Sequence, residues 1–569
     1  MNHLKNLTLY GQYHDEFYST SLSMASIAKI EDLQPKENLS QRPSASRDLA
    51  QYICKMNHLK NLTLSGQYHD DFYSTALSMA STAKIEILHH NENLSQRPSS
   101  SRDLAQFICK MNHLKDLTLS GQYHDDFYST ASSMASTAKI EILHHNENLS
   151  QRPSASRDLA QFICKMNHLK NLTLYGLYHD DSYSTASSMA STAKIEILHH
   201  NENLSQRPSA SRDLAQYICK MNHLKNLTLS GQYHDDFYST SLSMASTAKI
   251  EDLQPKENLS QRPSASRDLA QFICKMNHLK NLTLYGQYHD DFYSTSLSMA
   301  STAKSEILHH NENLSQRPSA SRDLAQYICK MNQLKNLTLS GQYHDDFYST
   351  VSSMASTAKQ IDTLDLSADL SERPSALRHL AQFLCTCCKM KQHHDDFYSS
   401  SSSMALTAKD KCNTSSTVTD LTVHDRVLER WQDCGSMFDI VKRITIQVRD
   451  KTRYDVIHRI HLPSATELTI QTYDRRFRPA SLHDDPTSLP NAFHKVSSQL
   501  VKVTFTDLNI GNDQTKHTIQ AFRSTHDLKH LRILGFIRCG TDESLDPSSI
   551  DSNDEHRIQV EIVHGEPER

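Results

Sequence analysis

Glycine, proline, tryptophan and net charge are all scarce in this chain. Its 569 residues include 12 Gly, 15 Pro and one Trp, and 60 basic side chains nearly balance 65 acidic ones. The resulting charge of -5 gives no general attraction to nucleic acid or to an anionic membrane. A mean hydropathy of -0.59 excludes a membrane span, whereas an apolar content of 37% is too high for a chain that is disordered throughout. We therefore expect a folded protein whose partners include neither nucleic acid nor a membrane.

The sequence also lacks the short motifs that carry catalytic or nucleotide chemistry. It contains no G-x-x-x-x-G-K-[ST] phosphate loop, no H-E-x-x-H zinc motif, no G-x-S-x-G nucleophile motif and no kinase motif set. His69, Asp70 and Ser74 have the composition of a catalytic triad, but they are neighbours in one loop and helix start, where a capping Asp is the ordinary explanation. We expect no catalytic residues and no cofactor.

A secretory signal is missing as well, and the cysteines fit that absence. The first residues, MNHLKNLTLYGQYH, have no long apolar core, which predicts a cytoplasmic, reducing location. Six of the 12 cysteines recur at one spacing within an apolar pattern, as buried thiols do: Cys54, Cys109, Cys164, Cys219, Cys274 and Cys329. Cys385, Cys387 and Cys388 form a single cluster, whereas zinc sites usually show two spaced pairs, so we expect no metal site there.

What the sequence does contain is an internal repeat. MNHLKNLTL or a close variant opens seven copies with a period of 55 residues, at Met1, Met56, Met111, Met166, Met221, Met276 and Met331. In the second copy, Leu59, Leu62 and Leu64 match the pattern L-x-x-L-x-L of leucine-rich repeats, in which the first, fourth and sixth places are apolar. The repeat therefore predicts the architecture before any local assignment.

Each copy holds a second leucine-rich start. Ile85 and Leu88 occupy the first and fourth places, and His90 then falls on the sixth, normally apolar place. The seventh copy supports this register with Ile361, Leu364 and Leu366. Successive starts at 59, 85 and 114 are 26 and 29 residues apart, close to the length of one leucine-rich unit.

Each half copy is expected to return through a helix. In the second half, Ser99 or Ser101 is a candidate cap after Pro98, and the expected apolar face is Leu104, Phe107, Ile108 and Met111. In the first half, Asp70 or Asp71 is a candidate cap, and the expected apolar face is Phe72, Ala76, Met79, Ala80 and Ala83. A strand and a helix in each unit predict an α/β leucine-rich-repeat solenoid, a horseshoe with an inner parallel sheet and outer helices.

Two segments of each copy resemble a known family. L-K-N-L-T-L and S-R-D-L-A-Q-Y-I-C-K are similar to the ribonuclease-inhibitor-type leucine-rich repeats of NACHT, or NOD-like, innate immune receptors with expanded arrays of the invertebrate type; Leu104 and Ala105 correspond to that family's helix Leu-Ala. The resemblance implies recognition of a protein or microbial ligand on the concave face. The nucleotide-binding module that precedes such repeats in those receptors is absent from this sequence, so the resemblance implies a receptor fragment or a decoy.

The repeat and its breakdown divide the chain into four predicted segments. Residues 1–388 form the array, 389–420 a degenerate repeat and Ser-rich linker, 421–540 diverged leucine-rich repeats, and 541–569 an acidic tail with a possible capping strand over 558–563. The diverged strands are expected at these apolar groups: Val441, Ile444 and Ile446; Leu468 and Ile470; Leu500, Val503 and Phe505; Leu528, Leu531 and Ile533. A helix before the last of these strands is expected to bury Ile519 and Phe522.

Side chains at the third, fifth and seventh places should point to the concave face, because side chains alternate along a strand. These places differ between copies, which predicts a ligand-binding face anchored by Tyr, a large ring that loses little entropy on binding. The candidate residues are Tyr10, Asp32, Gln34, Lys36, Asn61, Thr63, Ile87, His89, Asn91, Tyr175, Asp252, Gln254, Lys256 and Tyr285. Ser65, Ser120, Ser230 and Ser340 replace the Tyr in other copies. The alternative is duplication of two cassettes whose exposed places drift freely.

Paired histidines recur at 89–90, 144–145, 199–200 and 309–310. Adjacent residues of a strand face opposite sides, and His89, His144 and His199 should lie two strands apart, about 9 to 10 Å, too far to share one metal ion. His90 and its counterparts should be buried, which predicts loosening of the array below about pH 6. Alternatives to ligand recognition are a structural scaffold or enzyme-inhibitor horseshoe and, with less support, a His-rich metal-binding protein.

Overall fold

The computed structural model forms two compact units, Met1–Phe292 and Tyr293–Arg569. It describes residues 4–11, 13–354, 361, 363–366, 373, 375–376, 378–380, 383, 420–424, 443–448, 465–472, 493, 497, 499–506, 512–524, 530–537 and 558–563.

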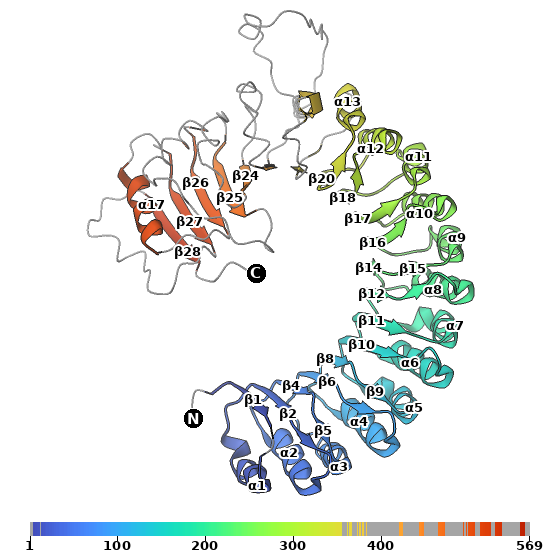
Figure 1. Ribbon diagram of the computed structural model, residues 1–569, viewed down its shortest axis with the longest axis vertical. Helices are drawn as coiled ribbons and strands as arrows, with labels where there is room; N and C mark the ends of the chain where they lie inside the picture. The colour runs from blue at the N-terminus through green and yellow to red at the C-terminus, as the bar shows by residue number, and fades with distance from the viewer. Residues whose placement is uncertain are drawn as a thin grey trace, which may run out of the picture. The chain divides into compact units, whose positions relative to one another are not determined.

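In the first unit, parallel strands pair one after another in chain order and form one sheet (Figure 1). They are β1 (Asn6–Tyr10), β2 (Asp32–Lys36), β4 (Asn61–Leu64), β6 (Ile87–His90), β8 (Asp116–Leu119), β10 (Ile142–Asn148), β11 (Asn171–Leu177), β12 (Ile197–Asn201), β14 (Asn226–Leu229), β16 (Asp252–Leu259) and β17 (Asn281–Tyr288). Short pairs continue some of these strands: β3 (Asn38–Leu39) with β5 (Gln67–Tyr68), β7 (Asn93–Leu94) with β9 (Gln122–Tyr123), and β13 (Asn203–Leu204) with β15 (Gln232–Tyr233).

The strand register confirms the assignment of places in both halves of a copy. Leu62 of β4 pairs with Leu88 of β6, and Leu64 pairs with His90. The fourth and sixth places therefore continue from unit to unit, and His90 takes the core position of a leucine with no exposed surface.

A helix follows each strand of the first unit, and these helices lie on the outer side of the sheet (Figure 1). They are α1 (Asp15–Met24), α2 (Pro43–Lys55), α3 (Asp70–Ser78), α4 (Pro98–Lys110), α5 (Asp125–Met134), α6 (Pro153–Lys165), α7 (Asp180–Met189), α8 (Pro208–Lys220), α9 (Asp235–Met244), α10 (Pro263–Lys275) and α11 (Asp290–Met299), which contains the boundary between the units. The 3-10 turns η1 (Ala25–Ile27), η2 (Ala135–Thr137) and η3 (Ala190–Thr192) follow three of them.

The expected apolar faces of the helices are confirmed almost in full. Leu104, Phe107, Ile108 and Met111 are buried in α4 and at its end, and Phe72, Ala76, Ala80 and Ala83 are buried in and after α3. Met79 is only half-buried, as are its counterparts Met134, Met189 and Met244.

The expected helix caps are wrong in both halves. α4 begins at Pro98, with Arg97 as N-cap and no capping side chain, because proline at the first helical position has a suitable φ and lacks an N–H that would be unpaired there. Ser101 Oγ instead donates to Leu94 O (3.1 Å) and accepts from the backbone N of His124 (3.1 Å). In α3 the cap is His69, whose Nδ1 accepts from the backbone N of Asp71 (3.2 Å), and Asp70 and Asp71 lie in the first turn.

The second unit has the same parallel arrangement. Its described strands are β18 (Ile307–Asn311), β20 (Asn336–Leu339), β22 (Thr363–Leu366), β23 (Asp420–His424), β24 (Arg443–Val448), β25 (Glu467–Thr472), β26 (Lys502–Thr506), β27 (Ile533–Ile537) and β28 (Gln559–Val563), paired in this order, with β19 (Asn313–Leu314) beside β21 (Gln342–Tyr343). Its helices include α12 (Pro318–Lys330), α13 (Asp345–Met354) and α17 (Asn512–Ser524). Each unit is therefore an α/β leucine-rich-repeat solenoid, as predicted.

One strand of the second unit has a different register from the expected one. Val503 of β26 pairs with Leu534 and Phe505 pairs with Phe536, so the first, fourth and sixth places are Leu531, Leu534 and Phe536. The spacing L-x-x-L fits both registers in the sequence, but only the observed one stacks Phe536 on Phe505, with ring centroids 5.3 Å apart. The expected burial of Ile519 and Phe522 in α17 is confirmed.

The predicted division at 388, 420 and 540 stays a prediction. The Ser-rich linker, apart from Asp420 at the start of β23, lies outside the described residues, and so do Cys385, Cys387 and Cys388.

Candidate binding surface

Side chains of the first unit alternate between a buried and an open side of the sheet. Leu62 and Leu88 are 0% exposed, whereas Asn61, Thr63 and Ile87 are half-buried and His89 and Asn91 are exposed. Because the helices cover the other side, the third, fifth and seventh places form the concave face of this unit (Figure 1).

The first copy places four candidate residues together on β1 and β2. Lys36 Nζ donates to Tyr10 Oη (3.3 Å) and lies 5.0 Å from the centre of that ring. Asp32 and Gln34 are half-buried on the same strand as Lys36, and Asn61 of β4 donates to the Asp32 carboxylate. Tyr10 is 64% exposed, so its ring stands out from this polar group.

The same pairing recurs between β16 of the fifth copy and β17 of the sixth copy. Lys256 Nζ lies 5.6 Å from the ring centre of Tyr285, and the two residues are partners in the strand register. Asp252 and Gln254 are half-buried, as their counterparts are in the first copy. In the first copy the tyrosine is on the earlier strand and the lysine on the later one, whereas here the lysine is on the earlier strand. The same contact therefore forms in both strand orders.

Tyr175 lies on β11 in the middle of the concave face, without a lysine beside it. Its register partners are Asn146 of β10 and Asn201 of β12. On the same strand, Leu177 is 41% exposed, and it is a residue that the sequence reasoning missed. The sequence does distinguish Leu177, because every other copy of the first unit has Gln at this place.

The backbone differs between the copies with Tyr and those with Ser at the seventh place. In a Ser copy, the backbone N of Gly121 donates to Tyr123 Oη (3.3 Å), whereas in a Tyr copy Tyr178 Oη donates to the carbonyl of Tyr175 (3.0 Å). The peptide between the seventh and eighth places is therefore turned over, and Gly176 has φ 133°. Only glycine fits this place, since a Cβ on Gly176 would lie 2.3 Å from the carbonyl oxygen of Glu147.

The exposed histidines are spread along the concave face. His89 and His199 are exposed and His144 is half-buried, and threonines occupy the fifth place of the strands between them. Partial burial and the positive charges of Lys256 and His144 lower the pKa of His199. Among the described residues, no group of three or more His, Cys, Asp or Glu side chains is arranged to hold a metal ion.

The second histidine of each pair belongs to a buried polar network on the helix side of the sheet. His90 Nε2 lies 3.2 Å from Tyr73 Oη, and Nδ1 lies 2.9 Å from Tyr123 Oη. Tyr73 also donates to Glu92, which accepts from Arg97 Nη1 (2.8 Å). Burial, assisted by the charge of Arg97, lowers the pKa of His90 to about 3.

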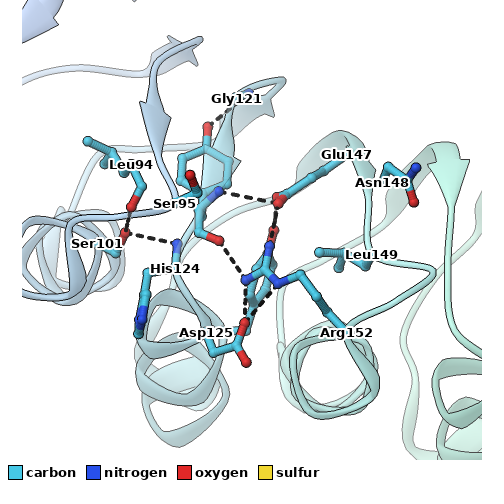
Figure 2. Close-up of polar contacts among 12 residues, drawn as sticks. Leu94, Ser95, Ser101, Gly121, His124, Asp125, Glu147, Asn148, Leu149 and Arg152 are labelled. Carbon is cyan, nitrogen blue, oxygen red and sulfur yellow. Dashed lines mark hydrogen bonds and ion pairs between the residues drawn. The ribbon is translucent and has the colours of Figure 1, made fainter.

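The same network recurs in the following copy (Figure 2). Arg152 lies between two carboxylates, with Nε 2.8 Å from Asp125 Oδ1 and Nη1 2.8 Å from Glu147 Oε1, and its Nη2 donates to Tyr123 O (2.6 Å). Arg152 thus ties the loop that opens one helix to the helix of the preceding half copy. The sequence reasoning missed this network, although the Glu and Arg recur five residues apart in every copy of the first unit.

Copies with proline at the sixth place lack part of the network. Pro35 and Pro255 replace the histidine, and neither carboxylate oxygen of Glu37 has a hydrogen-bond partner among the described residues. Burial raises the pKa of Glu37 to about 7. The two kinds of cassette therefore differ in the buried core as well as on the concave face.

Comparison with known proteins shows no family for this chain. No family model matches the chain, and no curated protein matches it. In the described residues, no helix has the length and apolar character needed to cross a membrane.

Three solved structures that align with the chain are distant. The leucine-rich repeat-containing protein LegL7 from Legionella pneumophila is 14% identical, with a TM-score of 0.29 over 66% of this chain and 96% of that one. A protein from Bacteroides fragilis is 13% identical, with a TM-score of 0.26 over 53% of this chain and 73% of that one. The complex of Rad7 and Elc1 in yeast gives 11% identity, a TM-score of 0.26, and coverage of 96% and 92%. The fold assignment accordingly rests on the strands and helices of this chain itself.

Proposed function

We propose that this protein recognises a protein partner through the concave face of its first unit, with Tyr10, Tyr175 and Tyr285 as anchors. The observation that carries the proposal is the exposure of these rings, 64%, 45% and 39%, on a face of mostly short polar side chains above a buried leucine layer. Aromatic side chains of this kind supply a large part of the energy of protein interfaces, because they bury much area and lose few rotamers.

Charge on the concave face supports a contact that is mainly apolar and hydrogen-bonded. Asp32 is matched by Lys36, and Asp252 by Lys256, in the two copies that carry them. The strands between them present mainly Asn, Thr, Ser, Ile and His at these places. Binding that depends little on salt is expected, since no large field of one sign steers the partner.

A narrower form of this proposal names the partner as a microbial ligand or a protein of an innate immune pathway. It rests on the resemblance of L-K-N-L-T-L and S-R-D-L-A-Q-Y-I-C-K to the repeats of NOD-like receptors. A scaffold or enzyme inhibitor would use the same face, and the identity of the captured partner separates these roles.

The test is a triple variant, Tyr10→Ser, Tyr175→Ser and Tyr285→Ser, which places at each position the residue that other copies carry naturally. Affinity capture followed by titration with each captured protein should show at least tenfold weaker binding for the triple variant. The control changes Ser74, Ser129 and Ser184 to Ala, three exposed residues on the helices. If every captured protein binds the triple variant and the control equally, the proposed use of the concave face is wrong.

A further inference from the structure

The fourth copy lacks an aromatic ring that the other copies of the first unit carry at the start of the helix. In the third copy, Phe127 of α5 stacks on Tyr123, with ring centroids 4.8 Å apart, and meets the edge of Tyr128 at 5.2 Å. The same ring is buried in three further copies, as Phe72 (2% exposed), Phe237 (1%) and Phe292 (1%). In α7 of the fourth copy this place is Ser182.

The missing ring leaves core atoms uncovered. Ser182 is half-buried although it is far smaller than the fully buried phenylalanine it replaces. Leu174, at the sixth place of β11, is also half-buried, whereas Leu64 and Leu119 are 0% exposed. Ala186 rises to 8% from the 1% of Ala131.

The sixth copy shows that the change at 182, and not the tyrosine strand, goes with this exposure. β17 has the same Tyr–Gly sequence as β11, with Gly286 at φ 138°, and its helix keeps Phe292. There Leu284, the counterpart of Leu174, is 1% exposed. Tyr178 stays covered at 1%, so the added exposure in the fourth copy lies at Leu174, Ser182 and Ala186.

Two exposed apolar side chains lie on the same strand as Leu174. Tyr175 and Leu177 flank Gly176 on β11 and are 45% and 41% exposed. Leu177 replaces the Gln of other copies, so the fourth copy loses a buried ring and gains an exposed apolar residue within six positions. Leu174 precedes Tyr175 on β11 and points to the helix side of the sheet, so a bound protein that covers Tyr175 and Leu177 must extend a side chain around the end of β11 to reach Leu174.

We propose that Leu174, Ser182 and Ala186 line a recess that accepts the phenyl ring of a phenylalanine side chain from a protein bound at the concave face. The chain itself shows which group fits, because Phe occupies the equivalent place elsewhere in the array. Removing a large core side chain leaves a hydrophobic space that an apolar group of similar size fills favourably. The proposal rests on the function proposed above, to which it adds a specificity-determining contact.

The recess is tested with a small probe and without any partner protein. A negative result would therefore count against the recess and not against the concave face as a binding surface. N-acetyl-L-phenylalaninamide serves as the probe, and binding to the full chain is followed by saturation-transfer NMR titration. Wild type and Ser182→Ala, which keeps the recess open, should both bind the probe in the millimolar range expected for a fragment. Ser182→Phe should weaken binding at least tenfold by filling the space.

Thermal unfolding supplies a second readout. Ser182→Phe should raise the midpoint by a few degrees, since it restores a ring packed in the core, whereas Ser182→Ala should change it little. Three results would overturn the proposal: equal binding of the probe by wild type and Ser182→Phe, no binding by either wild type or Ser182→Ala, or a lower midpoint for Ser182→Phe than for Ser182→Ala.

Discussion

At the scale of single residues, the buried His200 lies 4.0 Å from the buried Glu202, and the pKa values of the two groups shift in opposite directions. Burial lowers the pKa of His200 to about 3, assisted by Arg207, and burial raises the pKa of Glu202 to about 7 in spite of its hydrogen bonds from Tyr183 and Arg207. Tyr233 faces the other ring nitrogen of His200. The ordinary values are 6.5 for His and 4.5 for Glu.

Counting protons gives the sign of each effect on stability. The depressed pKa of His200 contributes stability that is present above pH 6.5 and is lost as the pH falls towards 3, because the unfolded chain binds the proton first. The raised pKa of Glu202 contributes stability that is present below pH 4.5 and is lost as the pH rises through about 7. Between pH 6.5 and 4.5 the folded and unfolded pairs hold the same number of protons, so the loosening expected below about pH 6 is shifted to lower pH.

We predict that the His200–Glu202 pair leaves the free energy of unfolding nearly constant between pH 6.5 and 4.5 and lowers it below pH 4.5. The fall should be about 1 kcal/mol per pH unit for each of the four buried histidines, His90, His145, His200 and His310. Urea titration at several pH values measures it. Changing Glu202 to Gln should move the onset of the loss at His200 up to about pH 6.5, and an onset that is the same in both proteins would contradict the proton count.

At the scale of elements, an arginine before each second-half helix connects that helix to the preceding half copy. Arg152 is only 26% exposed and pairs with Glu147, whose side chain is 2% exposed. Arg157, five residues later and within α6, pairs with Asp181 at 2.6 Å but is half exposed. The two ion pairs look alike in the sequence but differ in how deeply they are buried.

We predict that Arg152→Ala lowers the free energy of unfolding by roughly 3 to 5 kcal/mol, because it leaves a buried carboxylate without its cation. Arg157→Ala should cost at most about 1 kcal/mol, the usual value for an exposed pair. The loss in Arg152→Ala should grow as the pH rises and Glu147 ionises, since the buried carboxylate then has no cation beside it. Equal losses in the two variants, measured by urea unfolding, would show that the buried pair has no special role.

At the scale of the whole molecule, the two kinds of half copy are complementary neighbours. The second place of the strands alternates between Lys and Glu, and the charges pair across units: Lys5 and Lys60 with Glu31, Lys115 with Glu86, Lys170 with Glu141, Lys225 with Glu196 and Lys280 with Glu251. Each exposed ion pair contributes little to the stability of the fold by itself. The alternation nevertheless places each first half beside a second half of opposite charge throughout the first unit.

We predict that the array tolerates removal of one full period but not of half a period. Deleting residues 111–165 joins Lys110 to Met166 and restores equivalent neighbours, so the circular dichroism per residue should be unchanged and the unfolding midpoint only moderately lower. Deleting residues 85–113 places Lys60 beside Lys115 and one first-half helix beside another, which should abolish cooperative unfolding. Similar thermal unfolding of the two deletions would contradict the complementarity of half copies.

The repeat made the fold predictable, since a register error in one copy is corrected by the others. Leu62, Leu88 and His90 occupy the expected places because seven copies constrain one pattern. The diverged strand at Leu531 had no such support, and its register was misplaced by three residues. Ser101 and Asp70 were assigned as caps from residue type alone, whereas Arg97 and His69 take those positions.

The sequence by itself determined the solenoid, its parallel strands and the side of the sheet to which each place points, because a 55-residue period and the alternation of side chains along a strand are local properties. The fourteen candidate residues of the concave face stay a prediction about binding. Only the tertiary structure decided which charges are buried, that Glu147 meets Arg152 and that Leu174 loses its cover beside Ser182. Those outcomes depend on contacts between residues of neighbouring half copies, and burial sets the strength of an ion pair or the cost of a missing ring.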